Sequence, residues 1–260
     1  MAMELVRNLP YNHPYRWDGT EVGGKKLWRP TEIATALWLD AEDTSTVTLN
    51  GSTVSQWNDK SGNGRHATQA TAAQQPAYET ANAVLNGKSA LVWPTAGNAL
   101  AIVTPSFAHG NVFIVAAYST GAQATWLSGY TGLFGSNTTS DVGLVGDVSG
   151  ANWYNTSAFP FVRYDGGAEL NVTAGVVALP MPARIVHSRA ASNLTIPEAI
   201  GRDRNFSGRG WVGPIGEVIA TDAVLSDTNR TKIEGYLAWK WGLEANLPAN
   251  HPFKNLPPTV

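Results

Sequence analysis

The sequence predicts an all-β fold, a sandwich or a barrel of antiparallel strands with one helix near the C-terminus. Short runs rich in valine, isoleucine, threonine and aromatic residues recur along the chain, and clusters of glycine, asparagine, aspartate and serine separate them. Many short strands with frequent turn signals are typical of sandwiches and barrels. The 260 residues are 43% hydrophobic and 15% charged, which suffices for one large core.

The strands are expected where these apolar runs lie. Asn86-Gly87 and Gly166-Gly167 suit tight turns between strands. The predicted strands are residues 36–39, 53–57, 89–93, 100–103, 112–118, 142–145, 159–163, 169–172, 175–179, 184–188 and 216–221.

A helix is predicted over residues 226–242. Ser226 can cap its N-terminus, and Gly242 stands where a C′ glycine ends a helix. One face carries apolar side chains at helical spacing, namely Ile233, Leu237 and Trp241. The Pro- and Asn-rich residues that follow predict an extended tail.

The first 32 residues show neither a helical nor an alternating period, and glycine and proline pairs interrupt them. We interpret residues 1–32 as an extended attachment arm and residues 33–260 as the folded domain with its helix and tail. Aromatic residues of the arm are expected to anchor an interface. The predicted assembly residues are Leu9, Pro10, Tyr11, His13, Pro14, Tyr15, Trp17 and Trp28.

A short repeat links the arm to the tail. Residues 5–16 (LVRNLPYNHPYR) match residues 243–254 (LEANLPANHPFK), with the leucines, asparagines, prolines and histidine identical. One explanation is that the arm occupies, on a neighbouring subunit, a groove like the one the tail occupies on its own. A relic of an upstream domain, or chance in a Pro- and Asn-rich chain, are the alternatives.

Three stretches resemble laminin G-like domains of the concanavalin A-like superfamily, in the form common in bacteriophage virion proteins. The first is LWLDA at 37–41 with VSQWNDKSGNGRHA at 54–67, and the second is NGKSALVW at 86–93. The third runs from FSG at 206–208 through IGEVIA at 215–220 and LS at 225–226 to IEGYLAWKWGL at 233–243. The resemblance implies a two-sheet antiparallel jelly-roll sandwich, and it does not extend to residues 105–200.

The composition excludes some kinds of catalysis and predicts which classes of partner the protein does not bind. The absence of cysteine excludes disulfides and thiol catalysis, and the net charge of −2 without a basic stripe predicts no nucleic-acid partner. No apolar run approaches the roughly 20 residues of a membrane helix, so no membrane partner is expected. The N-terminus lacks the pattern of a signal peptide, which predicts synthesis in a host cytoplasm.

The sequence predicts that the protein is not an enzyme. Glu217 and Asp222 are the nearest candidate for a glycosidase carboxylate pair, but their spacing on a strand turns them to opposite faces. We expect a strand-edge glutamate and a turn aspartate. Histidine spacings typical of metal sites and serine nucleophile motifs are also absent.

No cofactor is predicted, although calcium stays open. The weak calcium candidates are Asp40, Asp43 and Asp59, with Glu42 beside them, because carboxylate oxygens are calcium ligands. The run from Asn58 to Gly64 is more simply a turn, since aspartate and asparagine side chains bond their own backbone there.

Aromatic residues in the least regular part of the chain could stack on a sugar. These weak candidates for glycan contact are Trp126, Tyr130, Trp153 and Tyr154. The alternative is that they pack loops onto the sheets.

These observations together predict a non-enzymatic structural protein on the surface of a phage virion. It would be a capsid decoration or a lectin-like module attached through its N-terminal arm, with other capsid or tail proteins, copies of itself and a cell-surface glycan as partners. The alternatives are a tail fibre or a free carbohydrate-binding protein that recognises or cleaves glycans.

Overall fold

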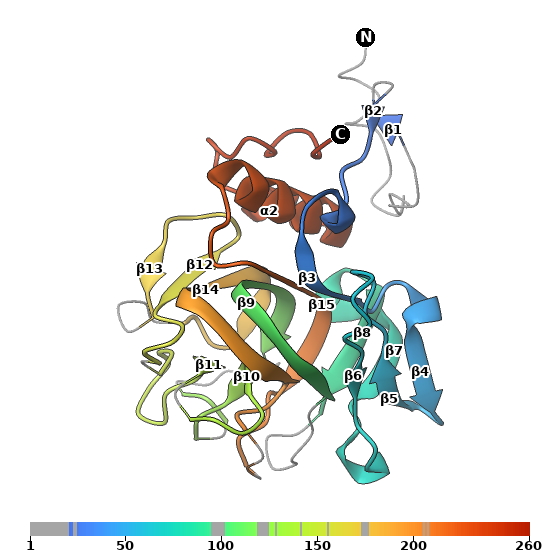
Figure 1. The fold of residues 1–260 in the computed structure, drawn as a ribbon, viewed down its shortest axis with the longest axis vertical. Coiled ribbons are helices and arrows are strands. Elements are labelled where there is room, and N and C mark those ends of the chain that lie inside the picture. The colour runs from blue at the N-terminus through green and yellow to red at the C-terminus, as the bar shows by residue number, and fades with distance from the viewer. Residues whose placement is uncertain are drawn as a thin grey trace.

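The computed structural model describes residues 21–22, 25–94, 102–118, 125–127, 129–140, 142–154, 156–172, 177–204, 206 and 208–260 (Figure 1). Most of its regular structure is antiparallel strand, and a C-terminal helix lies against one side of the strands. The strands are β1 Glu21–Val22, β2 Lys25–Lys26, β3 Thr35–Asp40, β4 Val47–Asn50, β5 Thr53–Trp57, β6 Ala67–Thr68, β7 Ala77–Asn82, β8 Lys88–Trp93, β9 Ile102–Tyr118, β10 Gly132–Ser136, β11 Gly143–Val145, β12 Phe161–Tyr164, β13 Leu170–Asn171, β14 Met181–Ile200 and β15 Gly213–Thr221.

Short 3₁₀ turns connect several strands, and one α-helix follows β15. The turns are η1 Pro30–Glu32, η2 Thr44–Thr46, η3 Ala72–Gln74, η4 Ala83–Leu85 and η5 Glu244–Asn246, and the helix is α2 Asp227–Trp241. As predicted, the Ser226 hydroxyl accepts the amide of Asn229 (3.2 Å), and Gly242 ends the helix in the left-handed region at φ 67°. Among the described residues, no helix has the length and apolar character needed to cross a membrane.

Strand pairing closes part of the fold into a barrel. Six strands form a ring in which each pairs with the next, in the order β9, β6, β5, β7, β8 and β15, and β15 returns to β9. Five further strands, β10 to β14, join the ring through the pairing of β14 with β9, while β3 pairs with β15 and β4 with β5, so that thirteen of the described strands belong to one hydrogen-bonded network. The predicted antiparallel β fold with a C-terminal helix is therefore confirmed, and its sheets are joined around the ring.

The two longest strands, β9 and β14, pair with each other along most of their length. The expected strands at 100–103 and 112–118 merge into the single strand β9 over their described part. Gly110, which lies between them, does not form a turn but allows the backbone of Ala223 to approach β9 closely. A Cβ there would lie 2.3 Å from the Cα of Ala223. Strands β4, β6, β7 and β10 were not predicted, and residues 177–179 of the expected strand 175–179 are not a strand.

The alternation of side chains along β3, β15 and β9 creates two cores. Leu37 and Leu39 of β3 point into the main core, to which strands of the ring and strands outside it both contribute, whereas Trp38 between them belongs to the core that packs against α2. The predicted apolar face of α2, with Leu237 fully buried, packs on this outer side of the sheet. The helix therefore covers a second core and any polar side chain that points to that side.

The described part of the predicted arm belongs to the folded domain. Leu27 forms a bridge with Thr259, and the amide of Trp28 donates to the carbonyl of Pro258 (3.0 Å). The Trp28 side chain is 1% exposed and lies edge-to-face with Tyr236, at 6.0 Å between ring centroids. Its assignment as an assembly anchor is thus corrected, because its indole is buried in the core of its own chain. The other predicted assembly residues, at 9–17, lie outside the described residues.

Candidate functional site

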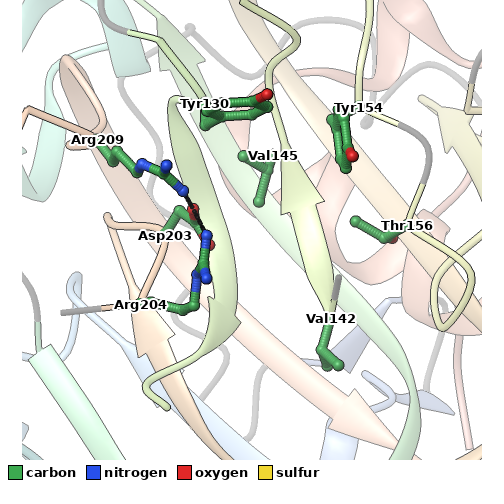
Figure 2. Close-up of a pocket in the computed structure, with 8 residues that line it drawn as sticks. All are labelled: Tyr130, Val142, Val145, Tyr154, Thr156, Asp203, Arg204 and Arg209. Carbon is green, nitrogen blue, oxygen red and sulfur yellow. Dashed lines mark hydrogen bonds and ion pairs between the residues drawn. The ribbon is translucent and has the colours of Figure 1, made fainter. Parts of the chain in front are cut away.

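A hollow of about 150 Å³ lies beside β11 and the connection between β14 and β15 (Figure 2). This volume is smaller than the roughly 300–1,000 Å³ of pockets for drug-sized ligands, so the hollow suits one ring of a larger ligand. Its described lining residues are Tyr130, Val142, Val145, Tyr154, Thr156, Asp203, Arg204 and Arg209. We call this site the tyrosine hollow.

The tyrosine hollow brings together two of the four aromatic residues predicted for glycan contact. Tyr130 and Tyr154 are half-exposed and meet edge-to-face, with ring centroids 5.2 Å apart. Tyr130 precedes β10, and Tyr154 is held by a bond from its amide to the carbonyl of Val145 (2.6 Å). Partly exposed tyrosine rings combine apolar faces with polar hydroxyls, a combination that suits sugar recognition.

The other two aromatic candidates are structural, which corrects their assignment. Trp126 and Trp153 are 6% and 1% exposed and contact each other, with ring centroids 4.8 Å apart. Both also pack near Trp211, and Tyr118 lies edge-to-face with Trp211 at 4.7 Å. This aromatic cluster is part of the main core. Burying these large rings removes much apolar surface from water, which stabilises the fold.

Charge in the hollow is concentrated on one carboxylate and two guanidinium groups. Asp203 accepts from Arg209 Nη1 (2.6 Å) and from Arg204 Nε (3.3 Å). The Arg209 guanidinium also lies over the Tyr130 ring, 4.6 Å from its centroid, and both arginines lie over the 47% exposed ring of Phe206. The arrangement offers hydrogen-bond donors and an acceptor next to aromatic faces.

The backbone at the hollow is strained. Tyr130 and Arg204 adopt positive φ angles of 55° and 52°, which is uncommon for residues with a side chain. Such conformations cost about 1–3 kcal/mol each and gather at sites where function requires a particular side-chain position. The strain therefore marks the hollow as a candidate binding site.

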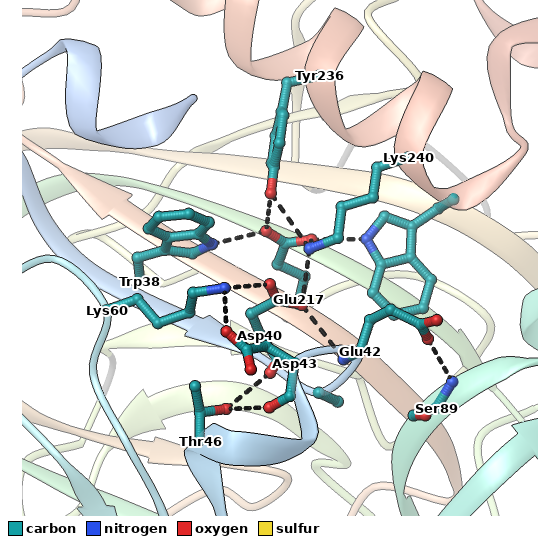
Figure 3. Close-up of polar contacts among 12 residues, drawn as sticks. Trp38, Asp40, Glu42, Asp43, Thr46, Lys60, Ser89, Glu217, Tyr236 and Lys240 are labelled. Atoms are coloured by element: carbon teal, nitrogen blue, oxygen red, sulfur yellow. Dashed lines mark hydrogen bonds and ion pairs between the residues drawn. The ribbon is translucent and has the colours of Figure 1, made fainter. Parts of the chain in front are cut away.

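Two of the three calcium candidates, Asp40 and Asp43, bind the ammonium group of Lys60 (Figure 3). Lys60 Nζ lies 2.8 Å from an Asp40 oxygen and 2.7 Å from an Asp43 oxygen, in the place a bound cation would take. Asp59 instead accepts from the amides of Trp38 and Ser61 at 3.0 and 2.9 Å, as the turn interpretation predicts. Glu42 accepts the amide of Ser89, and the described residues contain no cluster suited to a metal ion.

Glu217 is a buried residue, which corrects the expectation of a strand-edge glutamate. It lies directly opposite Asp40 in the pairing of β15 with β3, on the side that faces α2. Trp38 Nε1 and the Tyr236 hydroxyl donate to one oxygen (2.7 and 2.8 Å), and the other accepts from Lys240 Nζ and Trp241 Nε1 (both 2.7 Å). Sequence spacing could not reveal the Asp40–Glu217 pair, because the two residues belong to distant strands.

A second buried charged pair joins β9 to β14. His109 Nε2 contacts Glu198 Oε1, and the two side chains are 0% and 2% exposed. Burial alone would lower the pKa of His109, but the Glu198 charge and hydrogen bond raise it above the usual 6.5. The imidazole also stacks on Phe107, with ring centroids 4.5 Å apart. The pair is enclosed by the core and has no access to a ligand.

The tail copy of the repeated motif packs against α2 and forms hydrogen bonds with it. His251 Nε2 lies 3.2 Å from the buried carboxylate of Glu234, and the Trp239 indole donates to the carbonyl of Phe253 (2.8 Å). Phe253 packs over Gly235, where an added Cβ would lie 2.6 Å from the Cβ of Phe253, and Lys254 Nζ donates to the carbonyls of Glu244, Ala245 and Leu247. The histidine and leucines shared with the arm copy, and the aromatic and basic positions that end the motif, therefore have structural roles here.

A wider hollow of about 370 Å³ lies between β12, β14 and the start of α2. Its arginines are already matched by carboxylates of the chain. Arg163 and Arg189 bind Glu169, and Arg230 binds Glu234 at 2.7 Å. The arginines of the tyrosine hollow are paired in the same way, but that hollow adds two partly exposed tyrosine rings, which the described lining of the wider hollow lacks, and is therefore the stronger candidate.

No protein-family model matches this sequence, and comparison with curated proteins gives no significant match.

Proposed function

We propose that this protein is a non-enzymatic structural protein of a phage virion, a capsid decoration or surface module that binds a glycan in the tyrosine hollow. Its fold would be a jelly roll of the concanavalin A-like kind. The single observation that carries the binding proposal is the convergence of Tyr130 and Tyr154 with the Arg209–Asp203 pair. The virion assignment is supported by the sequence resemblance to laminin G-like domains.

Binding rather than cleavage is supported by the carboxylates. Glycosidases flank the scissile bond with two carboxyl groups, whereas the described lining of the hollow contains Asp203 alone, held by two arginines. Asp40 and Glu217 do lie side by side, but α2 covers them and lysines occupy their oxygens. Neither set is arranged to cleave a glycosidic bond.

Attachment through the arm is supported by the repeated motif. In the tail, the shared leucines are buried beside α2 and the shared histidine reaches a helix carboxylate. Residues 5–16 carry the same residue types, so they are chemically suited to a helix surface of this kind on a neighbouring subunit or capsid protein. Preorganised Pro-rich segments lose little entropy when they dock.

Glycan binding is tested by replacing Tyr154 with alanine. Loss of one stacking face, worth about 1–1.5 kcal/mol, should weaken binding roughly tenfold. A glycan array with the intact chain identifies the sugar, and titration calorimetry measures the affinities. The matched control is Phe161→Ala, which removes an aromatic ring from β12 and should leave the affinity unchanged. An array without any bound glycan, or equal affinities for Tyr154→Ala and the wild type, would contradict the proposal.

Attachment is tested by deleting residues 1–20, which leaves Trp28 and its pairing with the tail in place. The truncated chain should keep its melting temperature, because the buried residues of the described domain begin after this segment. It should nevertheless fail to join particles or oligomers, as measured by co-sedimentation and light scattering. Normal assembly of the truncated chain would place the attachment surface elsewhere.

A further inference from the structure

The cluster beneath α2 holds a lysine against two carboxylates. Lys240 Nζ lies 2.6 Å from Asp40 Oδ1 and 2.7 Å from Glu217 Oε2 (Figure 3). The three side chains are 5%, 4% and 0% exposed. An amine, a carboxyl group that it can attack and a second carboxyl group that can carry its protons are thus in direct contact.

The surroundings of this cluster favour condensation. Trp38, Tyr236 and Trp241 enclose it, and all three donate hydrogen bonds to Glu217. Burial in an apolar shell penalises charged groups, so conversion of an ion pair into a neutral amide removes that penalty. Fixed contact also replaces the encounter of two separate reactants, which lowers the entropic part of the barrier to amide formation.

We propose that Lys240 and Asp40 form an intramolecular amide bond between Nζ and Cγ, with Glu217 as the proton carrier. This is a single reaction of the chain upon itself, and it does not depend on glycan binding. It would join α2 to β3 covalently in a sequence without cysteine.

The step balances without any co-reactant. Glu217 accepts a proton from the Lys240 ammonium, and the free amine attacks Asp40 Cγ to form the N–C bond. The second proton leaves the nitrogen through Glu217, and both protons depart with the Asp40 oxygen as one water molecule when the C–O bond breaks. One hydrogen remains on the amide nitrogen, and Glu217 returns to its starting state.

Lys60 completes the arrangement. Its Nζ lies 2.8 Å from Asp40 Oδ2, the oxygen that becomes negative when the carboxyl carbon is attacked. A positive donor at this distance stabilises such an oxyanion. Lys60 itself is a poorer nucleophile here, because it is 22% exposed and is also held by the 36% exposed Asp43.

The pKa directions assign the roles. Burial raises the pKa of Glu217 against the opposing charge of Lys240, which favours the protonated form that this carboxyl group takes after it has accepted a proton. Burial also acts to raise the pKa of Asp40, but Lys240 and Lys60 lower it overall. These opposite directions agree with the geometry, in which Glu217 contacts the same ammonium group as Asp40 and can exchange protons with it.

Mass spectrometry of the intact wild-type chain tests the proposal. The denatured protein should weigh one water less than its sequence, and fragmentation of a proteolytic digest should join the peptides that contain residues 40 and 240. A full sequence mass in folded protein, also after prolonged incubation, would overturn the proposal. So would water loss located at another residue, such as a succinimide.

Variants separate the reaction from the fold. Glu217→Gln keeps a side chain of similar shape without a proton-accepting carboxylate, and it should retain the full mass, as should Lys240→Arg. The matched control is Lys254→Arg, because Lys254 contacts only backbone carbonyls in the hydrogen bonds that hold it in the tail. This variant should still lose water. Water loss at the same position in Lys240→Arg would contradict the assignment. If the variants do not fold, the wild-type mass remains decisive.

Discussion

Replacement of His109 by leucine is expected to lower the free energy of unfolding by about 3–5 kcal/mol, the usual cost of removing one partner of a buried ion pair. Glu198 would keep its carboxylate in the core, where the described structure offers it no other charged partner. Denaturant unfolding at pH 6, followed by tryptophan fluorescence, measures this difference.

The double variant His109→Leu/Glu198→Leu is the matched control. It removes both charges and should recover most of the lost stability, because replacing a buried pair with apolar residues is often neutral. Its pH dependence adds a second check. The pKa of His109 is higher in the folded than in the unfolded protein. Its pairing with Glu198 therefore adds its full share to the free energy of unfolding below pH 6.5, and this share is lost as the pH rises through the folded-state pKa. The wild type should therefore lose stability over this range relative to the double variant.

Replacement of Trp211 by alanine should cost about 3–5 kcal/mol, the range for removing a large aromatic side chain from a core. Trp211 is 0% exposed, its indole donates to the carbonyl of Ala117 (3.1 Å), and its ring lies parallel to Trp153, with centroids 6.4 Å apart. Thermal and denaturant unfolding measure the loss.

The control for this variant is Leu127→Ala, in the same region but 52% exposed. Exposed substitutions usually change stability by less than about 0.5 kcal/mol. A small effect of Trp211→Ala, similar to the control, would mean that the aromatic cluster contributes little to the fold. Binding of a glycan to Trp211→Ala, if it stays folded, would further show that the tyrosine hollow does not need this support.

Local signals in the sequence were sufficient for the helix and for most strands. The cap at Ser226, the apolar face with Leu237 and the glycine at Gly242 all act within a few residues of one another. β7 could not be found in this way, because its residues are mostly polar and partly exposed. Its strand conformation depends on pairing with β8, a tertiary contact that residue patterns do not record.

The candidate site was only partly accessible from the sequence. Composition suggested aromatic residues in loops, but only the fold separates the accessible Tyr130 and Tyr154 from the buried Trp126 and Trp153. The carboxylate pair was sought within one strand, whereas Asp40 meets Glu217 across the pairing of β3 with β15. Residues brought together by long-range register leave no signal in the spacing of a single sequence.

The pairing of the first described residues with the last ones has a mechanical consequence. Tension on an N-terminal tether would enter the domain at Leu27, which pairs with Thr259, and would pass through the tail to α2. The tyrosine hollow lies near β10 and β11, at the end of the molecule remote from this entry point (Figure 1). A pull on the N-terminal side of the domain would therefore act first on the Leu27–Thr259 bridge and on the contacts between the tail and α2.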